Sequence, residues 1–195
     1  MTAKGFYNPV FYKDRIPTED RGARFVWGIV WLLLFRASPQ PLWGWRRALL
    51  RCFGARIHPD ARIYPSVRVA APWKLAVGAR SCIGPHVECY NVSPITIEDD
   101  VTVSQYTYLC TASHDIQSPG RELITRPITL RRGSWIFARA MLGPGVTVEE
   151  GGVVGASAMV TKNVPAFCVF AGNPAHQISE RRFRGSRSGD PPPSS

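Results

Sequence analysis

The sequence contains no Cys-x-x-Cys motif, and its five cysteines are an odd number spread over 195 residues. The missing motif argues against a structural zinc site, and the scattered cysteines argue against a disulfide framework. The first nine residues also lack the charged-then-apolar start of a signal peptide. We therefore expect a protein of the reducing cytoplasm with free, partly buried thiols at Cys52, Cys82, Cys89, Cys110 and Cys168.

Acidic residues are also scarce. The chain has 14 acidic residues against 24 basic ones, a net charge of +10. Such an excess indicates an anionic partner, which can be a nucleic acid, a membrane surface or a phosphorylated small molecule. Aromatic and basic residues do not interleave as in a nucleic-acid-binding module, so we expect no nucleic-acid partner. Part of the excess lies in residues 181–195, a basic, Pro-rich tail that we expect to be disordered.

Hydrophobic runs long enough to cross a membrane are missing as well. One apolar run, FVWGIVWLLLF at residues 25–35, has 11 residues, whereas a membrane span needs about 20. A helix over residues 24–36 can pack over one end of the main fold or into a subunit contact, with Trp27, Trp31 and Leu34 on one face. It can instead contact an anionic membrane surface, which would place the protein at the inner face of the membrane. We expect packing, because apolar stripes serve protein cores more often than membranes.

An aliphatic residue recurs every six positions in the second half of the chain. The series is Leu130, Ile136, Leu142, Val148, Val154 and Val160, and a mostly small residue follows each by four positions. The same spacing holds earlier in three triplets, which are Ile57, Ile63 and Val69; Val77, Ile83 and Cys89; Ile97, Val103 and Leu109. Between triplets the phase slips by two residues, at Leu75-Ala76 and at Ile95-Thr96. This regularity is typical of an internal structural repeat.

A period of six does not fit an α-helix with 3.6 residues per turn. It fits short strands joined by tight corners, with apolar side chains pointing inward on each of three sides, so that coils stack into an all-β solenoid. We expect about five coils between residues 57 and 165. A helical, apolar segment (1–56) would precede them, and a closing segment (166–180) would follow.

The repeat is interrupted once, between Leu109 and Leu130. Insertions in a solenoid loop out from the stack, often on its binding face. We therefore expect residues 110–129 to form a protruding loop. His114 lies on this loop and is a candidate functional residue.

Three stretches resemble the hexapeptide-repeat acyltransferases, in the branch of the galactoside and maltose acetyltransferases. They are Ser113-His114-Asp115 on the loop, SWIFARAMLGPGVTVEEGGVVGASAMVTKNVP at residues 134–165, and FAGNPA at residues 170–175. Within that branch the chain resembles the colanic acid biosynthesis acetyltransferases, which the apolar stretch ending in LLRCFGA (49–55) also fits. The resemblance covers about residues 43–178.

The resemblance implies a left-handed parallel β-helix of hexapeptide repeats that forms a homotrimer, with active sites between neighbouring subunits. It implies acetyl-CoA as the acyl donor and a sugar or sugar-phosphate hydroxyl as the acceptor, in exopolysaccharide biosynthesis. Such anionic substrates would also account for the positive charge. The predicted activity is therefore that of an acetyl-CoA-dependent O-acetyltransferase.

Acetyl transfer to a hydroxyl needs a base that takes the hydroxyl proton as the oxygen attacks the thioester. His114 matches the family's catalytic position, and histidine suits this task because it titrates near neutral pH. By the same resemblance Glu122 matches the acid that orients this histidine, and the adjacent Asp115 is its competitor. Ser113 and Cys110 are too close to His114 in sequence to make a good nucleophile–base pair, so we expect direct transfer in a ternary complex.

The resemblance also assigns the donor site. Five residues match family positions that line the groove for the pantetheine arm and nucleotide of CoA: Trp135, Ala138, Ala156, Thr161 and Lys162. Trp135 can instead be a corner side chain packed on its neighbour, and Lys162 can be a solvated lysine. His176 stands where relatives often carry a basic residue for the CoA 3′-phosphate, and Arg181 or Arg182 can substitute for it.

On the acceptor side, Tyr90 and Asn91 match positions of the galactoside branch. Asn91 can bond a sugar hydroxyl or the backbone of a turn.

Two other functions compete with acetyl transfer. The fold also hosts a zinc carbonic anhydrase, whose site needs three converging imidazoles. His86 and His114 lie 28 residues apart with no third histidine nearby, so we expect no metal. The second alternative is a catalytically silent trimeric scaffold or binding module. The combination of His114 with the CoA-groove residues argues against it.

Overall fold

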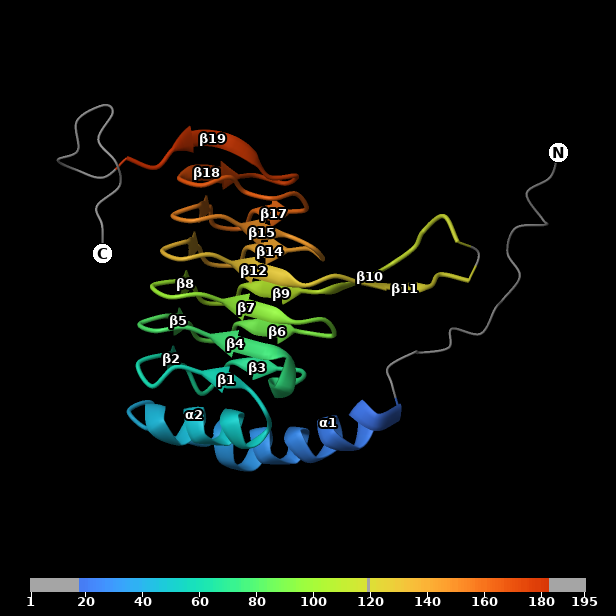
Figure 1. The fold of residues 1–195 in the computed structure, drawn as a ribbon, viewed down its shortest axis with the longest axis vertical. Coiled ribbons are helices and arrows are strands. Elements are labelled where there is room, and N and C mark those ends of the chain that lie inside the picture. Colours follow the sequence, from blue (N-terminus) through green and yellow to red (C-terminus); the bar gives the residue numbers. More distant parts are fainter. Residues whose placement is uncertain (1–17, 119, 183–195) are drawn as a thin grey trace.

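A computed structural model describes residues 18–118 and 120–182 of the chain (Figure 1). The expectations about the first nine residues and about the tail from residue 183 onward lie outside these described residues. The described part is a β-solenoid with helices across one end and a hairpin that projects from its side.

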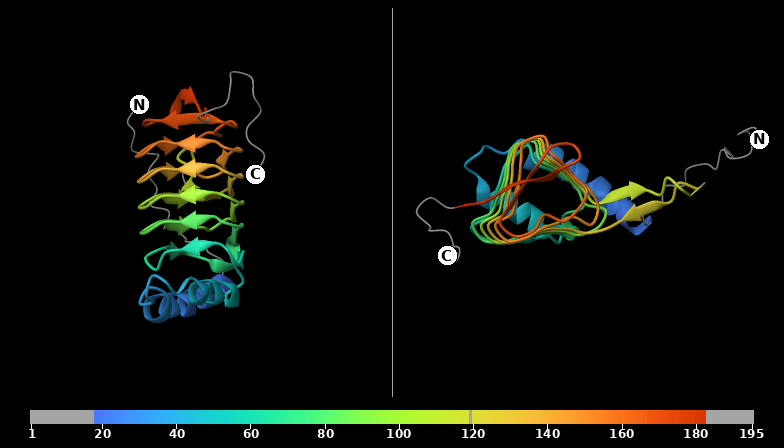
Figure 2. Two further views of the ribbon diagram at one scale, coloured as in Figure 1. Left: turned by 90° about the vertical axis from the view of Figure 1, so that its left-hand side faces the viewer. Right: turned by 90° about the horizontal axis from the view of Figure 1, so that it is seen from above.

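The solenoid has three faces, and seen from above it is a triangular prism (Figure 2). Face A contains β1 (Arg56–Ile57), β4 (Leu75–Val77), β7 (Ile95–Ile97), β12 (Ile128–Leu130) and β15 (Thr147–Val148). Face B contains β2 (Arg62–Ile63), β5 (Cys82–Ile83), β8 (Thr102–Val103), β13 (Trp135–Ile136), β16 (Val153–Val154), β18 (Cys168–Ala171) and β19 (His176–Glu180). Face C contains β3 (Arg68–Val69), β6 (Glu88–Tyr90), β9 (Tyr108–Cys110), β14 (Met141–Leu142) and β17 (Met159–Val160).

The six-residue repeat of the sequence forms the inner lining of this prism. Along face A the members Ile57, Val77, Ile97, Leu130 and Val148 pair in parallel register, and all are buried. A fully buried aliphatic side chain contributes about 1.5–3 kcal/mol, and a coil buries these side chains only by stacking on its neighbours. The predicted all-β solenoid is therefore confirmed.

The two phase slips fall at the start of strands on face A. β4 and β7 begin with the additional buried residues Leu75 and Ile95, which pair with each other. The extra residues lengthen one side of the coil and leave the inward register of the next strands unchanged.

The insertion is an antiparallel hairpin of β10 (Ala112–His114) and β11 (Leu123–Thr125). It lies between β9 of face C and β12 of face A, so it leaves the prism at the corner between those two faces. It extends well away from the body in Figure 1 and in the right view of Figure 2. Because β12 pairs directly with β7, the stack continues across the insertion.

The N-terminal helices close the lower end of the solenoid. Helix α1 (Thr18–Val30) continues into a π-helical turn, η2 (Trp31–Phe35), and α2 (Trp43–Cys52) follows. The Trp27 indole donates a hydrogen bond of 2.7 Å to the Val69 carbonyl, and the Trp31 indole donates one of 2.8 Å to the Val67 carbonyl. The predicted packing over the end of the main fold is thus confirmed for this face of the helix.

Leu34 does not share that face, so the prediction that Leu34 lies on one face with Trp27 and Trp31 is wrong. Its side chain is 45% exposed, whereas Phe35 is fully buried. The amide of Arg36 bonds the Trp31 carbonyl at 2.8 Å, which closes an i→i+5 turn. Such a turn is wider than an α-helical one, so Phe35 instead of Leu34 returns to the face of Trp31.

At the upper end, β18 extends face B and β19 turns back antiparallel to it. Every residue of β19 is exposed. A polar final strand of this kind ends the stack and shields the apolar interior.

Candidate functional site

His114 is the last residue of β10 and is exposed on the projecting hairpin. Its Nδ1 lies 2.9 Å from the main-chain carbonyl oxygen of Arg121, seven residues further along the same hairpin. A carbonyl oxygen only accepts hydrogen bonds, so Nδ1 carries a proton in this contact. Nε2 is then the basic nitrogen of the neutral ring, as a general base requires.

The predicted contact between His114 and Glu122 needs correction. Among the described residues, the acceptor at Nδ1 is the Arg121 carbonyl and not the Glu122 carboxylate. His114 pairs with Leu123 across the hairpin, and the Asp115 amide bonds the Glu122 carbonyl at 2.9 Å. Side chains alternate between the two faces of a strand, so Glu122 lies on the face of Asp115 and opposite to that of His114.

A cluster of polar and aromatic side chains lies on the outside of face C, next to the base of the hairpin. It consists of Glu88 and Tyr90 on β6 and of Tyr108 and Cys110 on β9, which pair across the two strands. The Tyr90 and Tyr108 rings are 6.4 Å apart. Burial, and then a hydrogen bond with Cys110, raises the pKa of Tyr108.

The sequence reasoning identified Tyr90 in this cluster but missed Glu88 and Tyr108. These two residues immediately precede the inward-facing Cys89 and Leu109 of the repeat. Residues that flank an inward position point outward. The repeat therefore contained the information needed to identify Glu88 and Tyr108 as outward-facing residues on the two strands that precede the insertion.

The predicted acceptor contact of Asn91 is also corrected. Asn91 is fully buried. Its Oδ1 accepts a hydrogen bond of 2.9 Å from the Ala71 amide, and its Nδ2 donates one of 2.6 Å to the Ala71 carbonyl. Of the two alternatives, the structure shows the backbone contact, which joins the corners of two consecutive coils.

Three of the predicted donor-site residues lie on face B or at its corner with face C. Trp135 on β13 is 40% exposed and stacks on Phe137 at 4.6 Å. The following corner contains Ala138, and the corner one coil above contains Ala156. The Ser157 amide bonds the Ala138 carbonyl at 2.9 Å, so the two corners lie directly over one another.

The other predicted donor-site residues lie elsewhere on the prism. Thr161 and Lys162 are exposed at the corner between faces C and A, just after β17. Arg181 donates hydrogen bonds from Nη1 to the carbonyls of Gly133 and Gly151, at 2.8 and 3.1 Å. Burial lowers the pKa of Arg181. This arginine therefore stabilises the corner between faces A and B, and its contact with a CoA phosphate stays a prediction.

Apart from Arg181, the candidate residues of the base and of the donor site thus belong to two separate regions of the prism. His114, Thr161 and Lys162 share the corner between faces C and A. Trp135 lies on face B, which is opposite that corner in a three-sided prism. Figure 2 shows this separation, because in the left view face B points toward the viewer while the hairpin lies behind. One chain cannot bring its own His114 to its own Trp135.

Comparisons with known proteins identify the family to which the chain belongs. No family model matches the chain. It is 40% identical over 170 residues to "Putative colanic acid biosynthesis acetyltransferase WcaF" of Escherichia coli K12, covering 85% of this chain and 93% of that protein. It is 27% identical over 138 residues to the galactoside O-acetyltransferase of the same organism, covering 69% of this chain and 68% of that protein.

A solved structure agrees with the fold. The hexapeptide-repeat acetyltransferase of Vibrio cholerae complexed with acetyl-CoA superposes with a TM-score of 0.76 at 26% identity, over 86% of this chain and 91% of that chain. The chain belongs to the hexapeptide-repeat acetyltransferases. The acetyltransferase therefore has the left-handed β-helix that the family resemblance implied.

The histidines of this acetyltransferase are also candidate metal ligands. Within residues 18–118 and 120–182, no three or more His, Cys, Asp or Glu side chains gather as a metal ion would require. His86 stacks on Tyr106 at 4.8 Å, at the corner between faces B and C. His114 leaves from a different corner, so the two imidazoles do not converge.

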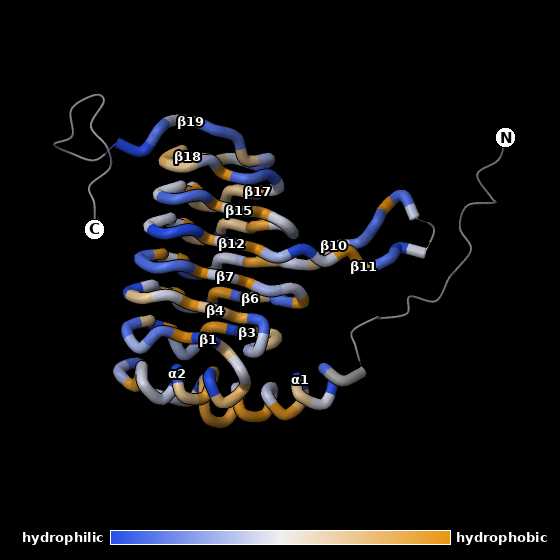
Figure 3. The backbone as a smooth tube through the Cα atoms, in the orientation of Figure 1, coloured by the Kyte–Doolittle hydropathy of each residue, from blue (hydrophilic) through white to orange (hydrophobic). Residues whose placement is uncertain are grey.

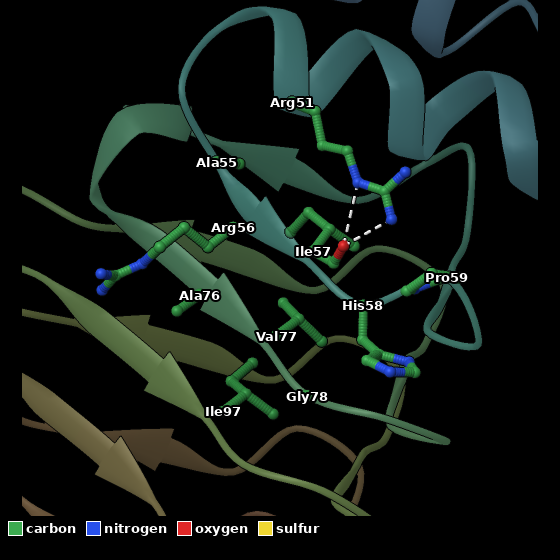
Figure 4. A pocket seen from close by; sticks show the side chains of 10 residues that line it. All are labelled: Arg51, Ala55, Arg56, Ile57, His58, Pro59, Ala76, Val77, Gly78 and Ile97. Atoms are coloured by element: carbon green, nitrogen blue, oxygen red, sulfur yellow. Dashed lines mark hydrogen bonds between the residues drawn. The ribbon is translucent and has the colours of Figure 1, made fainter.

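A hollow of about 560 Å³ lies near the lower end of the acetyltransferase (Figure 4). Arg51 of α2 and His58 after β1 form part of its wall, and Arg51 donates two hydrogen bonds to the Ile57 carbonyl. The hollow is lined by α2, by the face A side of the first two coils and by Ile97 of the third, whereas the hairpin leaves from the corner between faces C and A after the third coil. It is therefore separate from the candidate site.

Proposed function

We propose that this acetyltransferase moves an acetyl group from acetyl-CoA to a sugar hydroxyl in exopolysaccharide biosynthesis. The observation that carries the proposal is the contact between His114 and the Arg121 carbonyl, which leaves Nε2 as a base on a projecting hairpin. The relationship to a colanic acid biosynthesis acetyltransferase and to a galactoside O-acetyltransferase supports a sugar acceptor. The acetyl-CoA complex of the Vibrio cholerae relative supports the donor.

In the proposed mechanism, Nε2 of His114 takes the proton of the acceptor hydroxyl as its oxygen attacks the thioester carbonyl. The new C–O ester bond forms, the C–S bond breaks, and the imidazolium returns the proton to the departing CoA sulfur. Such a base accelerates a reaction by about 10²–10⁴-fold. Direct transfer is favoured because Cys110 is buried and its thiol bonds the Ala112 carbonyl at 3.1 Å.

We further propose that the enzyme is a homotrimer with its active sites between copies. The site needs His114 from one copy and Trp135 from the next, because a single prism keeps them on opposite sides. A corner that meets a different surface of an identical copy makes a head-to-tail contact, and such contacts close into rings. Three copies close a ring around an axis parallel to the solenoid.

In this arrangement the two sets of donor-site residues come from different copies. Trp135, Ala138 and Ala156 of one copy would line the pantetheine arm, with exposed backbone at the two alanine corners. Thr161 and Lys162 of the other copy would approach the CoA phosphates, where Lys162 acts as a point charge. The Glu88, Tyr90 and Tyr108 cluster, at the base of the hairpin, would face the sugar acceptor.

The proposal is tested by CoA release across a series of sugar acceptors, with the His114→Ala variant beside the wild type. We expect the variant to lose at least about 10²-fold in rate. The His58→Ala variant is a matched control, because His58 is an exposed histidine on the first coil, away from the hairpin. Equal rates for His114→Ala and the wild type would remove the base from the mechanism. A wild-type protein that does not bind acetyl-CoA would instead favour the silent scaffold.

A further inference from the structure

The first helices carry an apolar surface that faces away from the solenoid. On α1 and η2, the side that packs on the first coil contains Trp27, Trp31 and Phe35. The opposite side exposes a continuous row that we name the basal stripe, with exposed fractions of 71, 51, 45, 55 and 63% for Phe25, Val26, Ile29, Leu32 and Leu33. Figure 3 shows this hydrophobic band along the lower side of the helix.

The basal stripe has the spacing of one helix face. Its members follow one another at intervals of one, three, three and one residues, which is the pattern of an amphipathic helix. The stripe is also held rigidly, because the reverse side of the helix is anchored through the Trp27 and Trp31 indoles to the first coil. Two further apolar residues of the N-terminal helical segment are exposed. Leu42, just before α2, is 48% exposed, and Trp45, within α2, is 45% exposed.

Basic residues outnumber acidic ones in the helices and the first coil, the part of the chain that carries this apolar surface. Residues 18–69 contain nine arginines against the three acidic residues Glu19, Asp20 and Asp60. Asp20 is in addition paired with Lys74 at 3.4 Å. Arg21 is exposed four residues before the stripe begins. Arg36 is exposed three residues after it ends, with its guanidinium carbon 5.5 Å from the centre of the Trp31 ring.

We propose that the basal stripe and its arginines form a docking surface for an anionic lipid bilayer. An amphipathic helix with a basic border inserts its apolar side into the boundary between headgroups and acyl chains, while its cations bind the anionic headgroups. The described helices are too short to cross the bilayer. The contact is therefore one in which the solenoid stands on the membrane surface.

Charge distinguishes this occupant from a second copy of the chain. Two copies placed base to base would bring two excesses of arginine against each other, whereas an anionic bilayer offers the opposite charge. In the proposed trimer, an axis parallel to the solenoid would place three stripes in one plane. Three simultaneous weak insertions bind much more tightly than one.

The test is flotation of the full chain with vesicles of phosphatidylcholine and phosphatidylglycerol, compared with vesicles of phosphatidylcholine alone. We expect binding to the anionic vesicles that weakens as salt is added. The Phe25→Ser/Leu33→Ser variant should bind at least about tenfold less, because two of the most exposed apolar side chains are lost. The Arg36→Gln variant should bind about fivefold less.

Ile178→Ser is the matched control, because Ile178 is 59% exposed at the opposite end of the solenoid. It should bind vesicles like the wild type. If circular dichroism shows that the first stripe variant does not fold, a second stripe variant, Ile29→Ser/Leu32→Ser, repeats the test.

Three outcomes would overturn the proposal. They are absence of wild-type binding to anionic vesicles, equal binding by the wild type and folded stripe variants, and a doubling of mass without lipid that the stripe variants abolish. The last outcome would identify a second copy as the occupant. None of these readouts uses acetyl transfer, so the result is independent of the proposed function.

Discussion

The Nδ1 atom of His114 lies 2.9 Å from the carbonyl oxygen of Arg121, so main chain of the hairpin itself holds the ring. Main-chain positioning depends on the hairpin's backbone and not on the side chain of residue 121. Arg121 has φ of +46°, a conformation that glycine adopts without strain.

We therefore expect the Arg121→Gly variant to keep its turnover number within roughly threefold of the wild type, since the carbonyl stays in place. Steady-state acetyl transfer by this variant and by His114→Ala measures the difference. A collapse of turnover in Arg121→Gly to the level of His114→Ala would show that the side chain, and not the carbonyl, is needed.

Two inactive variants should restore activity when they are combined in one oligomer. If His114 and Trp135 meet only between copies, coexpressed His114→Ala and Trp135→Ala chains form some sites with both native residues. With random mixing at equal amounts, about a quarter of the sites are intact. CoA release by the copurified mixture measures this fraction. No recovery above the separate variants would place both residues in sites built from one copy.

Asn91 should be important for stability and not for acceptor binding. The Asn91→Ala variant leaves the amide and carbonyl of Ala71 without the partners they have in the structure. The loss of such buried hydrogen bonds costs about 1–3 kcal/mol each. Urea unfolding should show the decrease, while KM for the sugar stays unchanged. A selective rise in KM with unaltered stability would restore the acceptor role.

Arg46 should be essential for the attachment of the helices to the solenoid. It is fully buried and donates hydrogen bonds to the Ile63, Pro39 and Gln40 carbonyls and to the Ser38 hydroxyl. Removing the guanidinium leaves these neutral acceptors without a donor, and each buried acceptor left unsatisfied costs about 1–3 kcal/mol. We expect Arg46→Ala to lower the free energy of unfolding by at least about 2 kcal/mol, measured with denaturant. The exposed Arg56 is the control, and Arg56→Ala should have an effect within about 0.5 kcal/mol.

Thiol reactivity should separate the cysteines. Burial raises the pKa of Cys89 to about 12, so its thiol stays protonated at pH 8, whereas Cys52 is exposed. Only the thiolate reacts with alkylating reagents. Mass spectrometry after brief iodoacetamide treatment should find Cys52 modified and Cys89 unmodified until the chain is unfolded. Rapid modification of Cys89 in folded protein would contradict its place in the core.

Much of the fold was predictable because the solenoid is built from a repeat between residues that are close in sequence. Within each run from Ile57 to Val160 the inward positions are six residues apart, so the strands, the slips and the insertion are visible without tertiary information. Leu34 shows where this reasoning failed. The spacing of Trp27 and Trp31 suggested an α-helix, and the wider π-helical turn exposed Leu34 and buried Phe35.

The candidate site was less predictable, because its residues depend on contacts between distant coils. Asn91 is bound to Ala71, twenty residues away, and Arg181 to Gly133 and Gly151. No local pattern distinguishes such an internal contact from a ligand contact. Glu122 was assigned by resemblance alone, and the hairpin pairing placed it beside Asp115.

The sequence by itself determined the coil, its repeat, the position of the insertion and the histidine on it, because the period of six and its interruption are properties of neighbouring residues. Only the tertiary structure decided the partner of His114, the placement of the candidate residues on two sides of the prism, and the outward face of α1. Those features arise when the chain closes into a three-sided stack, which determines what each outward side chain meets.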